Sequence, residues 1–309
     1  MTGQRPTLTI PPKKRALVLP GGGGRGAYQV GVAKAFKEVG IEFEMIFGTS
    51  IGGLNGAMIA QGDLKRLEEL WAGIRPWDIF KLPSAQQIGR LFFGRKLGLL
   101  DTTPLEELLR REMDLKKLKA SYSKVGLFST DLCCLETRLI SVDDIHSNNE
   151  LIDALMATAA VPIAFPPRQL HGSGLWVDGG LVRNTPMRAA IDQGAEEIFM
   201  VLLHPDQFTV CPTNMWQVLA RCLDIVLDAS ARKELELAQL YNRLIAEGAE
   251  EATGMRSVRI ELFQPRKPVP ITLLEIDPDR SRNLINAGYE DAMDHLVAMF
   301  ESEAPARAS

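Results

Sequence analysis

The stretch that decides the fold is EMIFGTSIGGLNGAMIA, residues 44–60. A short apolar run opens it, and Gly48-Thr49-Ser50-Ile51-Gly52 follows with the pattern G-x-S-x-G. This pattern is typical of a nucleophile elbow, a sharp turn between a strand and a helix that carries a serine at its tip. A side chain at Gly48 or Gly52 would collide with the opposite arm of such a turn. We therefore predict that Ser50 is presented at a helix N-terminus, where the amide dipoles favour negative charge.

A glycine run, Gly21-Gly22-Gly23-Gly24-Arg25-Gly26, lies between an apolar segment at residues 16–19 and a helix predicted for residues 27–39. Bare backbone can turn several N–H groups towards one point, as an anion-binding loop requires. Residues 21–26 are therefore the candidate oxyanion hole for Ser50. Arg25 would add positive charge beside the loop, and a surface ion pair is its alternative role.

The general base has two candidates in the sequence. Asp178-Gly179-Gly180 follows an apolar strand at residues 174–177, so a tight turn could present the carboxylate directly to Ser50. Burial with few hydrogen bonds would raise the pKa of Asp178 and make it a better base. His204 follows an apolar strand at residues 197–203 and would complete a Ser-Asp-His triad.

A rival hypothesis uses the same glycines. Gly21-x-Gly23-x-x-Gly26 satisfies the dinucleotide-binding pattern, and Glu42 or Glu44 lies near the position of a ribose-binding acid. This hypothesis of a dinucleotide-binding oxidoreductase explains neither the serine elbow nor the turn at Asp178. A P-loop is excluded because no Lys-Ser/Thr pair follows the glycines.

Composition narrows the class of protein. The chain has 309 residues, 46 % of them hydrophobic, which is enough for one large domain or two small ones. A net charge of −4 argues against nucleic acid as the main partner. The four cysteines show neither metal-ligand nor disulfide spacing, so we expect them to be reduced and to bind no metal. We also expect no cofactor. Residues 1–15 show no signal-peptide pattern, and no apolar run approaches the roughly 18 residues of a membrane span.

Strands alternate with helices along the chain, which predicts an α/β fold with a mostly parallel central sheet sandwiched by helices and a helical C-terminal extension. We expect a flexible tail at 1–14, a catalytic core at 15–205, C-terminal helices and late strands at 206–300 packed on the core, and a flexible tail at 301–309. Within the extension we predict helices at 215–227, 232–247 and 281–300 and strands at 258–262 and 271–276. Residues 91–100 read as an amphipathic segment that covers the core, or as a lid that touches lipid.

Taken together, the motifs at Gly21 to Gly26, Gly48 to Gly52 and Asp178 to Gly180 resemble those of the patatin-like phospholipase family. Supporting stretches are Ser129-Thr130-Asp131-Leu132, residues 157–162 with Phe165-Pro166-Pro167, and Val182-Arg183-Asn184-Thr185-Pro186. The resemblance covers residues 15–204 and continues more weakly over 277–292. Pro20 and Gly24 depart from common family residues without removing a catalytic group.

This resemblance implies a Ser-Asp dyad, with Ser50 as nucleophile, Asp178 as general base and the glycine loop as oxyanion hole. It further implies metal-free hydrolysis of acyl esters in phospholipids, lysophospholipids or neutral glycerolipids. We expect a cytoplasmic protein, since neither a signal peptide nor a membrane span is visible in the sequence. Because such substrates lie in membranes, we also expect it to contact a membrane peripherally.

Overall fold

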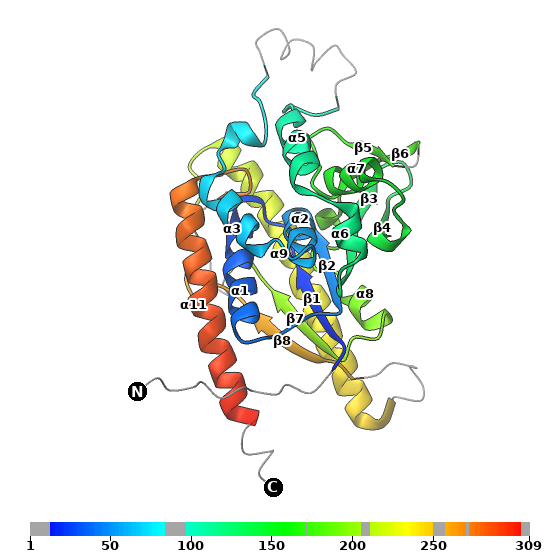
Figure 1. The fold of residues 1–309 in the computed structure, drawn as a ribbon, viewed down its shortest axis with the longest axis vertical. Coiled ribbons are helices and arrows are strands. Elements are labelled where there is room, and N and C mark those ends of the chain that lie inside the picture. Colours follow the sequence, from blue (N-terminus) through cyan, green and yellow to red (C-terminus); the bar gives the residue numbers. More distant parts are fainter. Residues whose placement is uncertain are drawn as a thin grey trace.

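The computed structural model describes residues 13–83, 97–170, 172–204, 211–249, 257–269 and 272–303. These residues form a single sheet in the order β5-β6-β3-β2-β1-β7-β8, with β4 paired to β3 as well (Figure 1). Its strands are β1 (Arg15–Leu19), β2 (Met45–Thr49), β3 (Lys124–Asp131), β4 (Glu136–Ser141), β5 (Arg168–Leu170), β6 (Ser173–Asp178), β7 (Glu197–Val201) and β8 (Arg259–Phe263).

The centre of the sheet is parallel and one end is antiparallel. Strands β3, β2, β1, β7 and β8 run in one direction, whereas β4, β5 and β6 join in antiparallel pairs. Parallel strands in the middle are buried on both faces, and β1 and β7 are buried along their whole length. The predicted α/β architecture with a mostly parallel sheet is confirmed.

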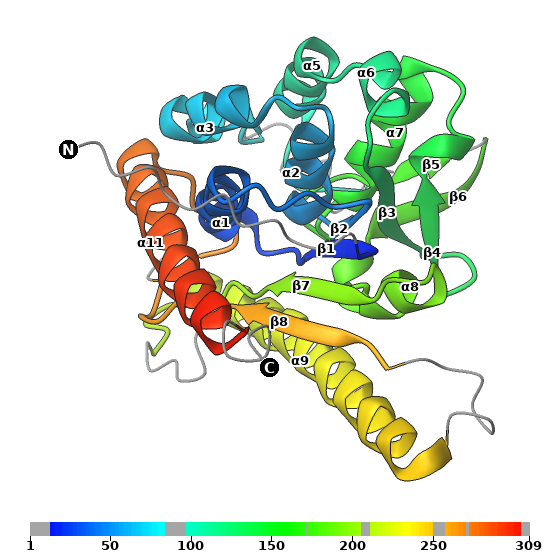
Figure 2. The ribbon, with the colours of Figure 1, turned by 60° about the horizontal axis from the view of Figure 1, so that its bottom comes forward.

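Helices cover both faces of the sheet (Figure 2). One layer holds α1 (Ala27–Glu38), α2 (Ile51–Ala60), α3 (Leu64–Gly73), α5 (Thr103–Glu112), α6 (Leu115–Lys119), α7 (Asn148–Thr158) and α11 (Pro278–Glu303). The opposite layer holds α8 (Met187–Asp192) and α9 (Met215–Leu244). Alternate side chains of β1 point to opposite faces of the sheet. Leu17 and Leu19 pack in the hydrophobic core under the first layer of helices, and Ala16 and Val18 pack in the core on the α8 and α9 side.

The C-terminal region differs from the prediction in two places. The two helices expected at 215–227 and 232–247 are one helix of 30 residues, α9. The break was wrong because the residues between them contain no glycine or proline, and Asp228 pairs with Arg232 one turn later. The strand expected at 271–276 was also wrong, since its described residues form a turn whose Leu273 carbonyl accepts a hydrogen bond from Gly24 N–H.

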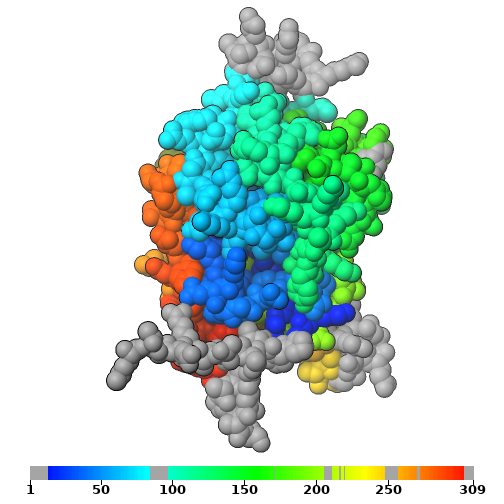
Figure 3. Space-filling model, viewed as in Figure 1, coloured from blue at the N-terminus to red at the C-terminus, as the bar shows by residue number. Residues whose placement is uncertain are grey.

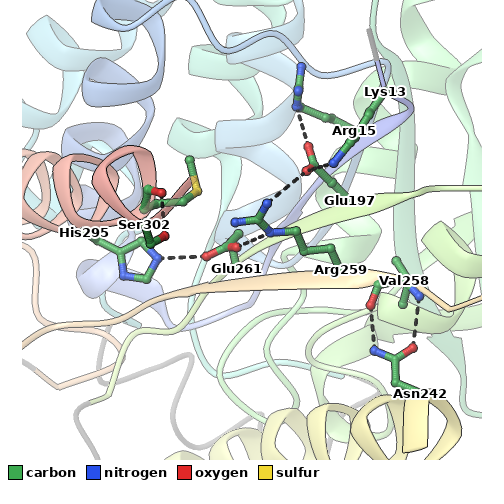
Figure 4. A network of polar contacts seen from close by, with 10 residues as sticks. Lys13, Arg15, Glu197, Asn242, Val258, Arg259, Glu261, His295 and Ser302 are labelled. Atoms are coloured by element: carbon green, nitrogen blue, oxygen red, sulfur yellow. Dashed lines mark hydrogen bonds and ion pairs between the residues drawn. The ribbon is translucent and has the colours of Figure 1, made fainter. Parts of the chain in front are cut away.

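Polar contacts tie the late elements to the first strand (Figure 4). Glu197 at the start of β7 accepts from Lys13 and Arg15 at 2.8 Å each. Arg259 of β8 reaches Glu261 at 2.6 Å, and His295 of α11 approaches the same carboxylate at 3.1 Å. This network lies at the end of the sheet where β1 begins, and the glycine run follows the opposite end of that strand.

Several predictions concern residues outside the described ranges. Most of the two tails, 1–14 and 301–309, and most of the amphipathic segment 91–100 fall there, and the division at residue 205 also stays a prediction. In the described part of the chain, no helix combines the length and the apolar character that crossing a membrane requires.

Candidate active site

Ser50 occupies a sharp turn between β2 and α2. Its backbone angles are φ 55° and ψ −130°, in a region that costs a non-glycine residue free energy. The turn is held by Thr158 at the end of α7. Ser50 N–H donates to Thr158 Oγ1 at 2.9 Å, and the same hydroxyl donates to the carbonyl oxygen of Phe128 at 2.6 Å. A strained serine fixed by neighbouring elements is the geometry that the elbow pattern predicts.

The two glycines of the elbow are required for different reasons. A Cβ atom at Gly48 would lie 2.4 Å from the carbonyl oxygen of Gly52, across the turn, as predicted. A Cβ atom at Gly52 would instead lie 2.1 Å from the carbonyl oxygen of Leu19 at the end of β1. Gly52 therefore lets α2 lie close to the neighbouring strand rather than to the other arm of the turn.

The sheet brings Asp178 to Ser50 through β3. Strand β4 pairs with residues 126–131 along one edge of β3, so β2 and β6 share the other edge. There Thr49 pairs with Phe128, and Asp178 of the antiparallel β6 pairs with the next residue, Ser129. The two strands thus meet end to end, and the residue that follows β2 faces the last residue of β6.

The Ser50 hydroxyl lies near the Asp178 carboxylate and lowers its pKa, and Asp178 Oδ1 accepts a hydrogen bond from Gly180 N–H at 2.8 Å. The side chain is buried, with 5 % of the residue surface exposed. Burial raises the pKa of Asp178 to about 6, while the hydrogen bonds from Ser50 and Gly180 act in the opposite direction. This carboxyl group is ionised at neutral pH yet more basic than an exposed aspartate.

The glycine run lies directly beside Ser50, and a Cβ atom at Gly21 would be 2.8 Å from Ser50 Cβ. Not all of its amides are available to a ligand. Gly21 N–H donates to Asn184 Oδ1 at 2.8 Å, and Gly24 N–H donates to the Leu273 carbonyl at 3.1 Å. In the residues that the structure describes, the N–H groups of Gly22 and Gly23 donate to no other segment. The predicted oxyanion hole over residues 21–26 thus narrows to two candidate donors in the loop.

Arg25 does not point at Ser50. Its guanidinium forms two hydrogen bonds of 2.8 Å with the carboxylate of Asp224 on α9, and both side chains are buried. The ion pair that we considered as an alternative is the observed arrangement, although it is buried rather than on the surface. Arg25 therefore ties the glycine loop to α9.

The histidines have other surroundings. His204 lies among Arg25, Arg221, Asp228 and Arg232, and its pKa falls to about 4, first because it is buried and then because Arg25 is close. His295 pairs with Glu261, and His171 lies outside the described residues. The hydrogen bonds that act on the Asp178 pKa come from Ser50 and Gly180 rather than from an imidazole.

The dinucleotide hypothesis fails on geometry. Strands β1 and β2 are parallel, and Glu44 N–H donates to the Arg15 carbonyl where both strands begin. The glycine run follows the other end of β1, a strand length of about 13 Å away. A ribose-binding acid must lie at the same end of the parallel strands as the glycines, so neither Glu42 nor Glu44 can bind a ribose there.

An apolar cavity of about 120 Å³ opens beside Ser50. Gly23, Gly24 and Ser50 line one end of it, and the remaining wall is almost entirely apolar. That wall comes from α2, α3 and the stretch that follows it, α5, the segment after α7 and the turn at Leu273: Ile51, Leu54, Asn55, Met58, Leu67, Leu70, Trp71, Ile74, Ile79, Phe80, Leu105, Leu108, Leu109, Glu112, Met113, Ala159, Val161, Phe165, Leu273, Leu274 and Ile276. Such a wall suits a hydrocarbon chain whose end lies at Ser50.

Sequence reasoning missed the residues that fix the site. Asn184, noticed only as part of a longer stretch, also donates through Nδ2 to the carbonyl oxygens of Gly21 and Leu227. Thr158 was likewise seen only as a motif residue. A polar residue inside an apolar stretch, such as Thr158 after Leu155-Met156-Ala157, is the signal that could have found it. Among the described residues, no group of three or more His, Cys, Asp or Glu side chains could hold a metal ion.

A family model described as patatin-like phospholipase matches residues 17–191, more than half of the chain. The chain is 28 % identical over 206 residues to a lysophospholipase of Phaeosphaeria nodorum, an alignment that covers 61 % of this chain and 12 % of that protein. It is 30 % identical over 177 residues to an uncharacterized NTE family protein of Mycobacterium tuberculosis, over 55 % of this chain and 27 % of that protein. The chain thus aligns with less than a third of either relative.

A solved structure has the same fold. VipD from Legionella pneumophila superposes with a TM-score of 0.51 over 93 % of this chain and 67 % of that chain, at 14 % sequence identity. At this identity the likeness concerns the arrangement of strands and helices only.

Proposed function

The chain belongs to the patatin-like phospholipase family, and from this premise we propose that it hydrolyses acyl esters of lipids with a Ser50-Asp178 dyad. The observation that carries the proposal is the placement of the Ser50 hydroxyl, which lines an apolar cavity, next to the buried Asp178 carboxylate whose pKa it lowers. A serine with a base in direct contact is a nucleophile ready for acyl transfer.

In the first half of the reaction, Ser50 Oγ attacks the ester carbonyl carbon while its proton passes to Asp178. The C–O bond to the leaving alcohol then breaks, and Asp178 returns the proton to the alkoxide oxygen. In the second half, Asp178 takes a proton from water, whose oxygen attacks the acyl carbon. The bond from that carbon to Ser50 Oγ then breaks, Asp178 returns the proton to Oγ, and the fatty acid leaves. Because the pKa of Asp178 is about 6, the carboxylate is ionised at neutral pH and can accept the proton in both halves.

The developing oxyanion would be held by backbone amides. Among the described residues, the N–H groups of Gly22 and Gly23 donate to no other segment, and Ile51 N–H opens α2 directly after Ser50. Loss of one such donor typically costs about 2.7–4 kcal/mol of transition-state stabilisation. The N-terminus of α2 would add its dipole to the same stabilisation.

The cavity supports a lipid as the substrate. Its apolar wall would take the acyl chain, and the lysophospholipase similarity points to a phospholipase A or lysophospholipase reaction. Access to such a substrate would require peripheral contact with a membrane surface.

A fluorophosphonate probe tests the dyad. We expect covalent labelling of the wild type, loss of labelling in Ser50→Ala, strong reduction in Asp178→Asn, and full labelling in His204→Ala. Equal loss in His204→Ala and Asp178→Asn would favour the triad that the sequence left open. Absence of labelling in the folded wild type, with and without phospholipid vesicles, would contradict the proposal.

A further inference from the structure

A second hydroxyl group lies directly opposite the proposed base. Ser129 of β3 pairs with Asp178 of the antiparallel β6. Asp178 N–H donates to the Ala160 carbonyl at 3.0 Å, so this amide does not bond to Ser129 across the ladder. In such a non-hydrogen-bonded pair the two side chains project from the same face of the sheet, with Cβ atoms about 4.5–5.5 Å apart. The Ser129 hydroxyl is therefore within reach of the Asp178 carboxylate.

Both side chains face the first layer of helices. Leu127, two residues before Ser129, packs in the core beneath that layer. Trp176, two residues before Asp178, packs with Ala157 of α7 in the same layer. Figure 3 views the molecule from the side of this layer, whose helices cover the sheet. Ser129 is accordingly fully buried.

The Ser129 hydroxyl is unusual for a buried polar group. Among the described residues, its Oγ atom has no hydrogen-bond partner. Native proteins leave few buried polar atoms unpaired, and a role in catalysis is one reason to keep such an atom. The neighbouring hydroxyl of Thr130, on the opposite face of β3, is by contrast paired with Thr137 at 2.8 Å. A partner for the Ser129 hydroxyl would have to appear in another state of the enzyme.

The acyl-enzyme is such a state, because acylation changes the surroundings of Asp178. In the free enzyme the Ser50 hydroxyl and Gly180 N–H both lower the pKa of this buried carboxyl group. Once Ser50 Oγ is esterified, it carries no hydrogen and cannot donate. Of these two donors only Gly180 N–H, 2.8 Å from Asp178 Oδ1, then remains. A buried carboxylate with fewer donors is less stable in its ionised form, which is the form that must activate the water.

We propose that Ser129 is a positioning residue for deacylation, whose hydroxyl rotates to donate to the Asp178 carboxylate when Ser50 is acylated. This inference rests on the proposed function and adds a residue to the second half of its reaction. Asp178 takes a proton from water, the water oxygen attacks the acyl carbon, and the bond to Ser50 Oγ breaks as Asp178 returns the proton to Oγ. Ser129 keeps its own proton throughout. Its hydroxyl holds the carboxylate ionised at the step where Ser50 cannot.

The proposal predicts different effects on two kinetic constants. With p-nitrophenyl octanoate, kcat/KM reports the steps up to acylation, whereas kcat also includes deacylation. We expect Ser129→Ala to lower kcat about tenfold or more, as for loss of a hydrogen bond to a charged group. Its kcat/KM should stay within about twofold of the wild type, because Ser129 has no bond to Asp178 in the free enzyme. Intact-mass spectrometry during turnover should show the octanoyl adduct at Ser50 accumulating in this variant.

Thr130→Val is the matched control. It removes a buried hydroxyl from the next residue of the same strand, on the face away from Asp178. We expect its kcat and kcat/KM to remain in the wild-type proportion, since a loss of stability reduces the active enzyme for both steps alike. Ser129→Cys is close to serine in size but carries only a weak donor, so its kcat should lie between those of the wild type and Ser129→Ala.

A folded Ser129→Ala protein whose kcat and kcat/KM fall by the same factor, or do not change, would overturn the role of Ser129. The wild type would still hydrolyse the ester in that case, so the dyad would be unaffected. Should Ser129→Ala not fold, the same comparison of kcat with kcat/KM in Ser129→Cys decides. Failure of the wild type to hydrolyse any acyl ester or to form an adduct at Ser50 would instead remove the proposed function, and this inference with it.

Discussion

The Ser50 side chain lies against the buried carboxylate of Asp178 and lowers the pKa of that carboxyl group. The contact arises because β2 and β6 meet end to end along one edge of β3, where their last residues pair with Phe128 and Ser129. The distance between Ser50 and Asp178 is therefore fixed by strand register. Sites built on regular elements hold their geometry well.

The pKa of Asp178 predicts the pH dependence of the reaction. Burial raises that pKa to about 6, and only the ionised carboxylate can accept the Ser50 proton. We expect kcat/KM on p-nitrophenyl octanoate to fall about tenfold per pH unit well below pH 6 and to level off above pH 7. A limb with its midpoint near pH 4, as for an exposed aspartate, would contradict the role of burial.

The same shift predicts that Asp178 lowers the stability of the fold at neutral pH. Its folded-state pKa of about 6 exceeds the reference value of 3.8, so folding disfavours the ionised form and stability is lost as pH rises through this window. At 1.36 kcal/mol per unit, the cost above pH 6 is up to about 3 kcal/mol.

Asp178→Asn should therefore unfold at a higher urea concentration than the wild type at pH 8, with the difference vanishing below about pH 4. Asp143→Asn, at an exposed aspartate of the 3-10 turn Val142–Asp144, is the control and should change stability little at either pH. A destabilised Asp178→Asn protein at pH 8 would show that the lost hydrogen bonds outweigh the removed charge.

Much of the site could be predicted because its chemistry is local in sequence. The elbow, the glycine run and the turn at Asp178 each need a particular short pattern, and the alternation of strands and helices orders them along one sheet edge. The assignment of β2 and β6 to the same edge of β3 is a matter of non-local pairing. Sequence patterns can suggest that Ser50 meets Asp178, but only the register establishes it.

The contacts that use up the loop amides could not be predicted. Gly21 N–H is taken by Asn184 and Gly24 N–H by the Leu273 carbonyl, and both partners come from distant segments. A backbone carbonyl carries no residue signature, so Leu273 was assigned to a strand on its apolar neighbours. The continuous α9 was missed although Asp228-Ala229-Ser230-Ala231 contains no glycine or proline and two of its residues are alanine, the strongest helix former.

Thr158 offers a test of how the elbow is held. Its hydroxyl accepts from Ser50 N–H and donates to the Phe128 carbonyl, so Thr158→Val leaves two buried backbone groups unpaired. We expect a loss of about 1–3 kcal/mol in unfolding free energy for each group, and a fall in kcat with little change in KM. Thr158→Ser keeps the hydroxyl and should recover most of the rate. Equal kcat values in the valine and wild-type proteins would show that the strained turn at Ser50 needs no such support.

The ion pair between Arg25 and Asp224 joins the glycine loop to α9, and its two ends should respond unequally to substitution. Asp224→Ala leaves the Arg25 guanidinium buried without its partner, and Arg25 Nε already lacks one among the described residues. Breaking a buried pair from one side costs about 3–5 kcal/mol, whereas replacing both partners by apolar residues of similar volume is often nearly neutral. Urea unfolding of Asp224→Ala and of the double variant Arg25→Met with Asp224→Leu measures the difference.

If the pair only packs the loop against α9, the double variant should recover both stability and ester hydrolysis. Recovery of stability without hydrolysis would mean that the charge of Arg25 itself acts on the reaction. This alternative is worth testing because Arg25 lies directly beside Gly24 of the glycine loop.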